Sequence, residues 1–268
     1  MKVVIVLVII VIVVLVGIWI YGFNEANDLK VDSKNISEYK DIKKVLIIFP
    51  HPDDEANSLS GTITQFVKYK IPVDWVILSK GERGTSDASL DENLKEVRSK
   101  EAEKVSHILG VNKLVVKDYP DNGISEFKDK LFNDLKNIIF ESNPDLIITY
   151  DESGGYGHPD HIIVSQVVTN LVKNDFKNIS LWYTSTPEKL FKKLSLPEQM
   201  ATDANFKSSR KSPNFKIWVG LDGLANKIKA VYTYQSQFNS FVKSVPIKQI
   251  PMWFYVSLTP YEYFYEVE

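Results

Sequence analysis

An uninterrupted apolar run opens the chain. Residues 3–23 contain no charged side chain, and Trp19 and Tyr21 stand near the end of the run. A helix needs roughly 20 apolar residues to cross a hydrocarbon core of about 30 Å, and amphipathic aromatic side chains favour the membrane interface. The pattern therefore predicts a single transmembrane anchor over residues 1–23. A cleaved signal peptide is the alternative, but its apolar region is typically about 7–15 residues long and ends at a small-residue cleavage site. No clear site of that kind is evident in "YGFNEAN".

A polar segment follows the apolar run. Residues 24–42 have no long apolar stripe and are predicted to form a linker to a folded domain over residues 43–268. Lys2 precedes the apolar run, whereas Glu25 and Asp28 follow it. Because the cytoplasmic flanks of membrane helices are enriched in positive charge, we expect a cytoplasmic N-terminus and a folded domain outside the cytoplasm.

From residue 43 onward, short apolar runs alternate with segments whose apolar residues recur at helical spacing. Strands are predicted at 44–49, 73–79, 113–119, 145–150 and 179–185, and helices at 57–70, 91–110, 126–143 and 158–173. This alternation predicts right-handed βαβ crossovers. The expected fold is therefore α/β, with a mainly parallel sheet and helices on both faces. Beyond residue 190 the pattern is weaker, and the segments 215–221, 221–234 and 251–258 are expected to add sheet and helix to the same core.

Composition narrows the chemistry. The chain has no cysteine, so disulfides and thiolate metal sites are excluded, and its four histidines are the only imidazoles that could bind a metal. The formal net charge of −2 gives no electrostatic reason to expect a nucleic-acid partner. Any metal must therefore be held by histidine and carboxylate side chains.

Two polar segments at the ends of predicted strands share a spacing. In "HPDDE", His51 and Asp54 are three positions apart, and in "GHPDH" the same spacing separates His158 and His161. Parallel sheets bind ligands at the carboxyl ends of their strands. Two histidines and one carboxylate are a common ligand set for catalytic Zn²⁺ with a position left for water, and such sites also accept other divalent transition metals. A helix cap is the alternative for Asp54 taken alone, but capping does not explain both segments.

The remaining side chains in these segments suit a hydrolytic reaction. If Asp54 faces a metal, its neighbour Asp53 is free to act as a general base toward a water whose pKa the metal lowers to about 7. His158, one turn before His161, is the natural group to stabilise the oxyanion that forms from a carbonyl substrate. These residues together predict a hydrolase of amides or esters.

The paired motifs resemble those of the LmbE-like, or PIG-L type, zinc-dependent N-deacetylases, over roughly residues 45–182. The resemblance implies a Rossmann-like fold and activity on N-acetylglucosaminyl compounds. It also implies roles for individual residues: His51, Asp54 and His161 as zinc ligands, Asp53 as general base, His158 at the tetrahedral intermediate, and Arg98, Tyr156 and Asp160 in or behind the substrate site.

Two points in the resemblance stay open. Arg98 lies in "EVRSKEA", where the family arginine reaches the substrate, but a surface ion pair with Glu101 or Glu103 is an equal alternative. Tyr234 stands where many members carry a histidine, so any role of that histidine is in doubt here.

We therefore expect a membrane-anchored deacetylase that removes the acetyl group from an N-acetylated amino sugar, on a lipid-linked or envelope glycan. One alternative is a deacetylase of a small soluble glucosamine conjugate of the thiol-biosynthesis type. Another is a non-catalytic, membrane-tethered carbohydrate-binding module, against which the presence of Asp53 argues. The sequence does not define the oligomeric state.

Overall fold

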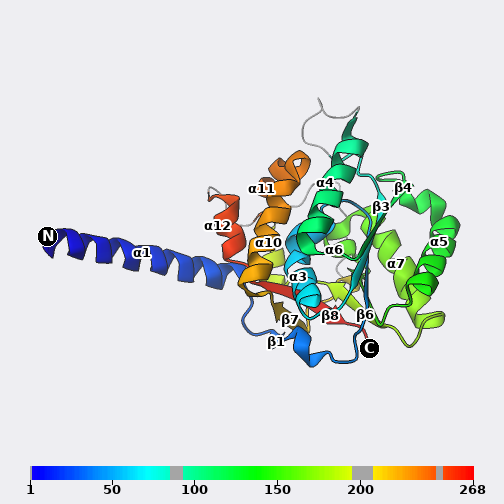
Figure 1. Cartoon of the computed structure of the whole chain (residues 1–268), viewed down its shortest axis with the longest axis horizontal. Coiled ribbons are helices and arrows are strands. Elements are labelled where there is room, and N and C mark those ends of the chain that lie inside the picture. Colours follow the sequence, from blue (N-terminus) through cyan, green and yellow to red (C-terminus); the bar gives the residue numbers. More distant parts are fainter. Residues whose placement is uncertain (1, 85–92, 195–207, 246–249) are drawn as a thin grey trace.

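An eight-stranded sheet forms the centre of the computed structural model, which describes residues 2–84, 93–194, 208–245 and 250–268 (Figure 1). The strand order is β1-β7-β8-β6-β5-β2-β3-β4. Neighbouring strands are parallel except where β8 pairs antiparallel with β6 and β7. The strands are β1 (Asp32–Lys34), β2 (Val45–Phe49), β3 (Val73–Ser79), β4 (Lys113–Tyr119), β5 (Leu146–Tyr150), β6 (Ser180–Thr184), β7 (Phe215–Trp218) and β8 (Tyr261–Glu266). The predicted α/β sheet with helices is confirmed. The sheet was expected to be mainly parallel and is mixed, because β8 runs antiparallel to both of its neighbours.

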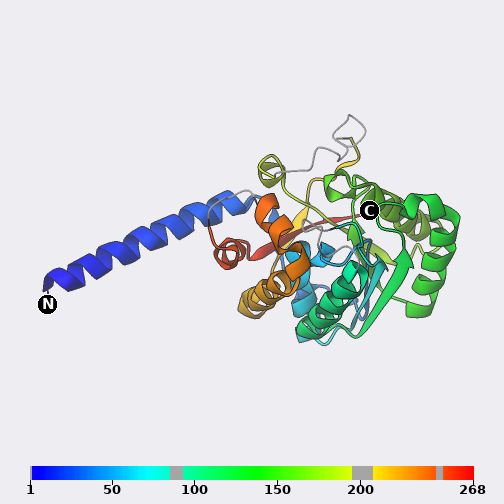
Figure 2. The same cartoon turned by 90° about the horizontal axis from the view of Figure 1, so that it is seen from above.

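Helices cover both faces of this sheet (Figures 1 and 2). One core contains side chains of α3 (Ser60–Lys68), α4 (Leu94–Leu109) and α10 (Gly220–Thr233), and the other contains side chains of α5 (Lys128–Ser142) and α7 (Pro159–Asn174). In β2, Val45, Ile47 and Phe49 point into the first core, whereas Leu46 and Ile48 point into the second. Burial on both faces explains why the central strands are continuously apolar. The shorter helices are α2 (Asp54–Ser58), α6 (Gly154–Gly157), α8 (Glu188–Phe191), α11 (Phe238–Ser244) and α12 (Met252–Ser257), with 3₁₀ turns at Ile36–Glu38, Ile124–Phe127 and Gln235–Gln237.

Several elements differ from the sequence prediction. The helix expected at 57–70 is divided at Leu59 into α2 and α3. The helix expected at 91–110 is described from Leu94 to Leu109, and residues 91–92 lie outside the described ranges. Gly110 follows it with φ 75°, as a glycine after a helix commonly does. The pattern did not predict β1 or β8.

The N-terminal helix α1 (Lys2–Ala26) projects from the body (Figures 1 and 2). It is the one helix among the described residues that is long and apolar enough to cross a membrane, and a signal sequence would have the same properties. The segment 24–42 is partly integrated into the body, because β1 pairs with β7 and Ile36 is buried. The division into anchor (1–23), linker (24–42) and domain (43–268) stays a prediction.

Candidate active site

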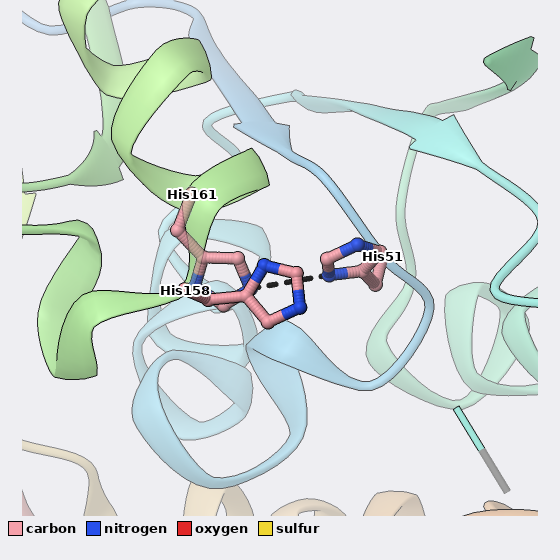
Figure 3. A group of neighbouring side chains, drawn as sticks. All are labelled: His51, His158 and His161. Carbon is pink, nitrogen blue, oxygen red and sulfur yellow. Dashed lines mark hydrogen bonds between the residues drawn. The ribbon is translucent and has the colours of Figure 1, made fainter. Parts of the chain in front are cut away.

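Two loops at the carboxyl ends of neighbouring parallel strands form the candidate site. β2 pairs with β5, so the loop that carries His51 lies beside the loop that leads to His158 and His161 (Figure 3). His158 is the N-cap residue of α7, and Pro159 occupies the first turn of that helix. Gly154 precedes them with φ 67°, and a Cβ at this position would lie 2.8 Å from the Cβ of His161. The glycine therefore allows the loop to pack closely against the base of α7.

The three predicted ligands converge on one point. His51 Nδ1 lies 3.1 Å from His161 Nε2, which lies 3.3 Å from Asp54 Oδ1. The other Asp54 oxygen, Oδ2, lies 3.7 Å from His51 Nδ1. Tetrahedral zinc with bonds of about 2.0–2.2 Å places its ligand atoms about 3.3 Å apart. The separations therefore fit a divalent cation held by this set.

Hydrogen bonds on the far side of each imidazole set its tautomer. His161 Nδ1 lies 3.2 Å from the carbonyl oxygen of Gly154, and His51 Nε2 lies 3.1 Å from Asp160 Oδ2 and 3.2 Å from Asp121 Oδ1. Because these partners accept, the protons belong on those nitrogens. His51 Nδ1 and His161 Nε2 then face each other as two acceptors. A proton or a metal ion must lie between them.

The pKa shifts agree with a site that holds a cation. Burial lowers the pKa of the His51 imidazole, but its hydrogen bonds with Asp121 and Asp160 outweigh this effect and raise the pKa to about 10. Burial raises the pKa of Asp54 to about 7, although His51 opposes the shift. The donor set thus takes up a positive charge at its centre, which a divalent metal can supply in place of the proton.

His158 is close to the same centre. Its ring lies 4.8 Å from that of His51 and 4.7 Å from that of His161, and the nearest ligand atoms of the three histidines all lie within 4.8 Å of one another. The backbone N–H of Asp160 donates to His158 Nδ1 at 3.2 Å, so the neutral ring carries its proton on Nε2. Burial and the nearby His51 lower the pKa of His158 to about 4. At neutral pH the side chain is therefore an uncharged donor.

Asp53 is paired with Arg98. Arg98 Nη2 donates to Asp53 Oδ1 at 2.9 Å and to the Pro52 carbonyl at 2.6 Å, while Nη1 donates to the Gly81 carbonyl at 2.7 Å. Arg98 is only 2% exposed. Burial raises the pKa of Asp53, and the Arg98 charge opposes the shift.

This placement bears on the open question about Arg98. The alternative of a surface ion pair with Glu101 or Glu103 is wrong, because Arg98 is buried and Glu101 instead accepts hydrogen bonds from Ser236 N (3.0 Å) and Oγ (2.6 Å). Arg98 holds the loop on which Asp53 lies. A direct contact between Arg98 and a substrate stays a prediction.

The two other expected substrate residues lie in different surroundings. Asp160 is 1% exposed and accepts from the backbone N–H groups of Asn122 (2.6 Å) and Ile124 (3.1 Å) in addition to contacting His51. It therefore supports a ligand from behind. The Tyr156 ring stands 4.9 Å from that of His161 and is half-buried, so it forms a wall of the site.

Sequence reasoning did not select two side chains of this site. Tyr150 donates to Asp54 Oδ1 at 3.0 Å and stacks on His161 with ring centroids 4.3 Å apart. Asp121 contacts His51 Nε2 and accepts from the backbone N–H of Arg83 at 2.8 Å. The available signal was position, because Tyr150 ends β5 and Asp121 follows the end of β4.

Tyr234 is fully buried near Glu55, and burial raises the pKa of both groups well above the usual range.

The comparison with known proteins agrees with the motifs. Residues 46–172 match the family model described as PIG-L, GlcNAc-PI de-N-acetylase, and the predicted resemblance to the PIG-L (LmbE-like) family is confirmed over this part of the chain.

The mycothiol S-conjugate amidase of Streptomyces coelicolor is 32% identical over an alignment of 146 positions, which covers 46% of this chain and 50% of the relative. The diacetylchitobiose deacetylase of Thermococcus kodakarensis is 35% identical over 134 residues, 49% of this chain and 50% of the relative. The chain thus spans about half the length of these curated relatives.

A solved structure extends the likeness beyond the matched motifs. The N,N'-diacetylchitobiose deacetylase of Pyrococcus horikoshii, complexed with an inhibitor, superposes with a TM-score of 0.63 over 87% of each chain at 22% identity. At that identity the likeness shows the fold.

Proposed function

We propose that the protein is a metal-dependent N-deacetylase of N-acetylglucosamine-type compounds. The observation that carries this proposal is the convergence of His51 Nδ1, Asp54 and His161 Nε2, with separations of 3.1–3.7 Å, beside a half-buried Asp53. The deacetylase names of relatives and the PIG-L domain support the reaction class.

Each group has a defined task in this proposal. His51, Asp54 and His161 would hold a divalent cation, for which Zn²⁺ is the first candidate and which supplies a water of lowered pKa and a polarised carbonyl. Asp53 accepts a proton from the attacking water and then donates it to the amine nitrogen as the C–N bond breaks. Arg98 orients Asp53 and limits the rise of its pKa.

His158 completes the site. Its Nε2–H donor is free because Nδ1 accepts from the Asp160 backbone, and its neutral state is favoured by burial. A donor aimed at the oxygen of the tetrahedral intermediate stabilises the negative charge that forms there. The products are acetate and a free amino sugar, which balances one water against one amide bond.

We further propose that α1 anchors the protein in a membrane as a single span, with the enzyme domain outside the cytoplasm. Supporting this, Val4–Ala26 is a 23-residue apolar helix, and its residues 4–21 are exposed on the body's outside. An anchor suits a lipid-linked or envelope glycan. The mycothiol S-conjugate amidase among the relatives supports the alternative, a small soluble glucosamine conjugate.

The test combines metal analysis with acetate release. The purified full chain is assayed with lipid-linked, polymeric and small soluble N-acetylglucosamine compounds, alongside Asp53→Asn and His161→Ala. We expect a bound divalent metal and acetate release in the wild type, loss of metal in His161→Ala, and retained metal in Asp53→Asn with turnover lower by about 100-fold or more, the usual effect of removing a general base.

Other outcomes separate the alternatives. Undiminished turnover in Asp53→Asn would contradict the general-base assignment. A wild type without metal and without acetate release, whose sugar binding is unchanged by Asp53→Ala, would support the non-catalytic binding module instead. The preferred substrate class in the panel decides between an envelope glycan and a soluble conjugate.

A further inference from the structure

The short helix α12 lies where α1 leaves the body. In both views α12 is on the side of the body from which α1 projects (Figures 1 and 2). Leu258, the residue after α12, packs against Gly22 of α1, where an added Cβ would lie 2.8 Å from Leu258 Cδ1. Asn27 Nδ2 donates to the carbonyl oxygen of Leu258 at 2.7 Å. The end of α12 is therefore fixed beside the last turns of α1.

This contact sets the depth of α12 relative to a bilayer. Gly22 lies about 27 Å along the helix axis from Val4, close to the hydrocarbon thickness of about 30 Å. Trp19 and Tyr21, whose amphipathic rings favour the interface, flank the same turn. The Trp19 ring stacks on the Phe23 ring with centroids 5.2 Å apart, and the Phe23 ring lies 6.2 Å, centroid to centroid, from the Tyr261 ring of the body. If α1 spans the membrane, the end of α12, which packs against Gly22, lies at the level of the membrane interface.

The composition of α12 suits that level. Residues 250–260 contain no charged side chain. Met252, Tyr255 and Val256 face the core, whereas Trp253 is 52% exposed and Phe254 is partly exposed. In water, an exposed indole ring leaves its apolar surface unburied. At a membrane interface the same ring lies in the headgroup region and buries that surface.

We propose that α12 is a second membrane contact, with Trp253 and Phe254 inserted into the interface of the leaflet from which α1 emerges. The occupant of this surface is the lipid bilayer itself. The inference rests on the proposed membrane insertion of α1. Its consequence is a two-point attachment that fixes the orientation of the domain on the membrane.

Two lysines, Lys189 on α8 and Lys193 just after it, also restrain the end of α1. Lys193 forms an ion pair with Glu25, and Lys189 donates to the carbonyl oxygen of Asn24. Asn27 is 1% exposed, and the backbone N–H of Asp28 donates to the Tyr263 hydroxyl at 2.8 Å. With its end restrained from several elements, α1 does not act as a loose tether, and α12 is held against the membrane.

The absence of cysteine allows a direct test with single spin labels. Trp253→Cys, Phe140→Cys and Val11→Cys are prepared in the full chain, labelled with a nitroxide and reconstituted into phosphatidylcholine–phosphatidylglycerol vesicles. Phe140 is the matched control, because it is an aromatic residue that is 77% exposed and lies on α5, away from α1 (Figure 1). Val11 reports whether α1 enters the bilayer. Phe254→Cys replaces Trp253→Cys if that variant fails to fold.

The measured quantity is the ratio of collision rates with oxygen, which concentrates in lipid, and with a polar nickel chelate, which stays in water. We expect this ratio to be several-fold higher at position 253 than at position 140, and highest at position 11. A ratio at 253 equal to that at 140, with position 11 in lipid, overturns the second contact and leaves the anchor standing. A water-exposed label at position 11 overturns both.

Discussion

Asp53 and Asp54 are neighbours in the sequence, but their carboxylates meet different partners. Asp54 accepts from the backbone N–H of His51 at 2.9 Å and from the Tyr150 hydroxyl at 3.0 Å, whereas Asp53 accepts from Arg98. The separation depends on the backbone, because Asp53 has φ 93°, a left-handed conformation that non-glycine residues seldom adopt. Backbone strain clusters at functional sites, and here the strained residue is the proposed general base.

The Arg98 guanidinium gives a residue-scale prediction. Arg98→Met removes the charge that holds down the pKa of Asp53, so this pKa rises and the base stays protonated to higher pH. In metal-loaded enzyme, the acidic limb of the kcat/KM profile should therefore move to higher pH. Arg98→Lys keeps the charge and should leave the limb near its wild-type position.

The same substitution has an independent stability readout. Breaking a fully buried charge pair costs about 3–5 kcal/mol, and this pair should cost less because the Asp53 side chain is 19% exposed. Arg98→Met should therefore also lower the denaturant midpoint, with Arg98→Lys in between. Acidic limbs that coincide in Arg98→Met and the wild type would contradict the assigned influence of Arg98 on Asp53.

At the scale of elements, Asp151 organises the loop between β5 and α7. It is 1% exposed and accepts from Ser153 N (3.1 Å), Ser153 Oγ (2.5 Å), Gly155 N (3.1 Å) and Lys211 N (2.8 Å). This carboxylate ties residues 153–155 to the segment that precedes β7. The loop in turn sets where His158 and His161 begin their helix.

Asp151→Ala should therefore damage stability and metal binding together. Leaving buried donors unpaired costs about 1–3 kcal/mol for each group, so the free energy of unfolding should fall by at least about 2 kcal/mol and the metal affinity should weaken. Asp175→Ala is the control, because its carboxylate is in a partly exposed ion pair with Lys136, of a kind worth about 1 kcal/mol or less. Equal losses in the two variants, by denaturant titration and metal titration, would count against the role of Asp151.

The elements also show where sequence patterns reach their limit. β2, β3 and β5 were predicted to within a residue because both of their faces are buried and their runs are apolar. β8, "YEYFYE", was missed because it contains two glutamates and lacks the continuous aliphatic run of the central strands. Glu262 in this strand is buried by contacts distant in the chain, with the N–H groups of Gly61 (3.0 Å) and Thr62 (2.7 Å) and with Lys227 (3.4 Å).

In the candidate site too, local motifs could be read from the sequence, whereas contacts between distant segments could not. His51, Asp54 and His161 could be chosen from spacing within two short motifs, because each motif sits at a strand end. The partners of Arg98 could not be chosen that way, because the Gly81 carbonyl and Asp53 reach it only through the packing of α4 against two loops. Asp121 and Tyr150 were identifiable as strand-end residues but carried no motif of their own.

At the scale of the whole molecule, a bound metal should stabilise the folded chain. Binding to the native state alone contributes about 2.7 kcal/mol when free metal is 100 times its Kd. Chelation of the wild type should therefore lower the melting temperature by about 5–10 °C, and readdition of Zn²⁺ should restore it. His161→Ala should show neither change in thermal scans of the detergent-solubilised chain. A chelator-induced shift of equal size in His161→Ala would place the stabilising metal elsewhere.

If α1 anchors the protein in a membrane as proposed, its attachment to the body decides how the domain meets a membrane-borne substrate. Inserting a flexible Gly-Ser segment between Tyr21 and Gly22, ahead of the contacts that Gly22, Glu25 and Asn27 make with the body, leaves β1 and the active site intact but separates the orientation of the body from that of the apolar helix. For a lipid-linked N-acetylglucosamine substrate in vesicles, kcat/KM should fall, because the site then samples many orientations and the effective substrate concentration drops. For a small soluble substrate in the same vesicles, kcat/KM should be unchanged. Equal changes for the two substrates would mean that the rigid connection has no part in substrate presentation, and would favour the soluble glucosamine conjugate as the natural substrate.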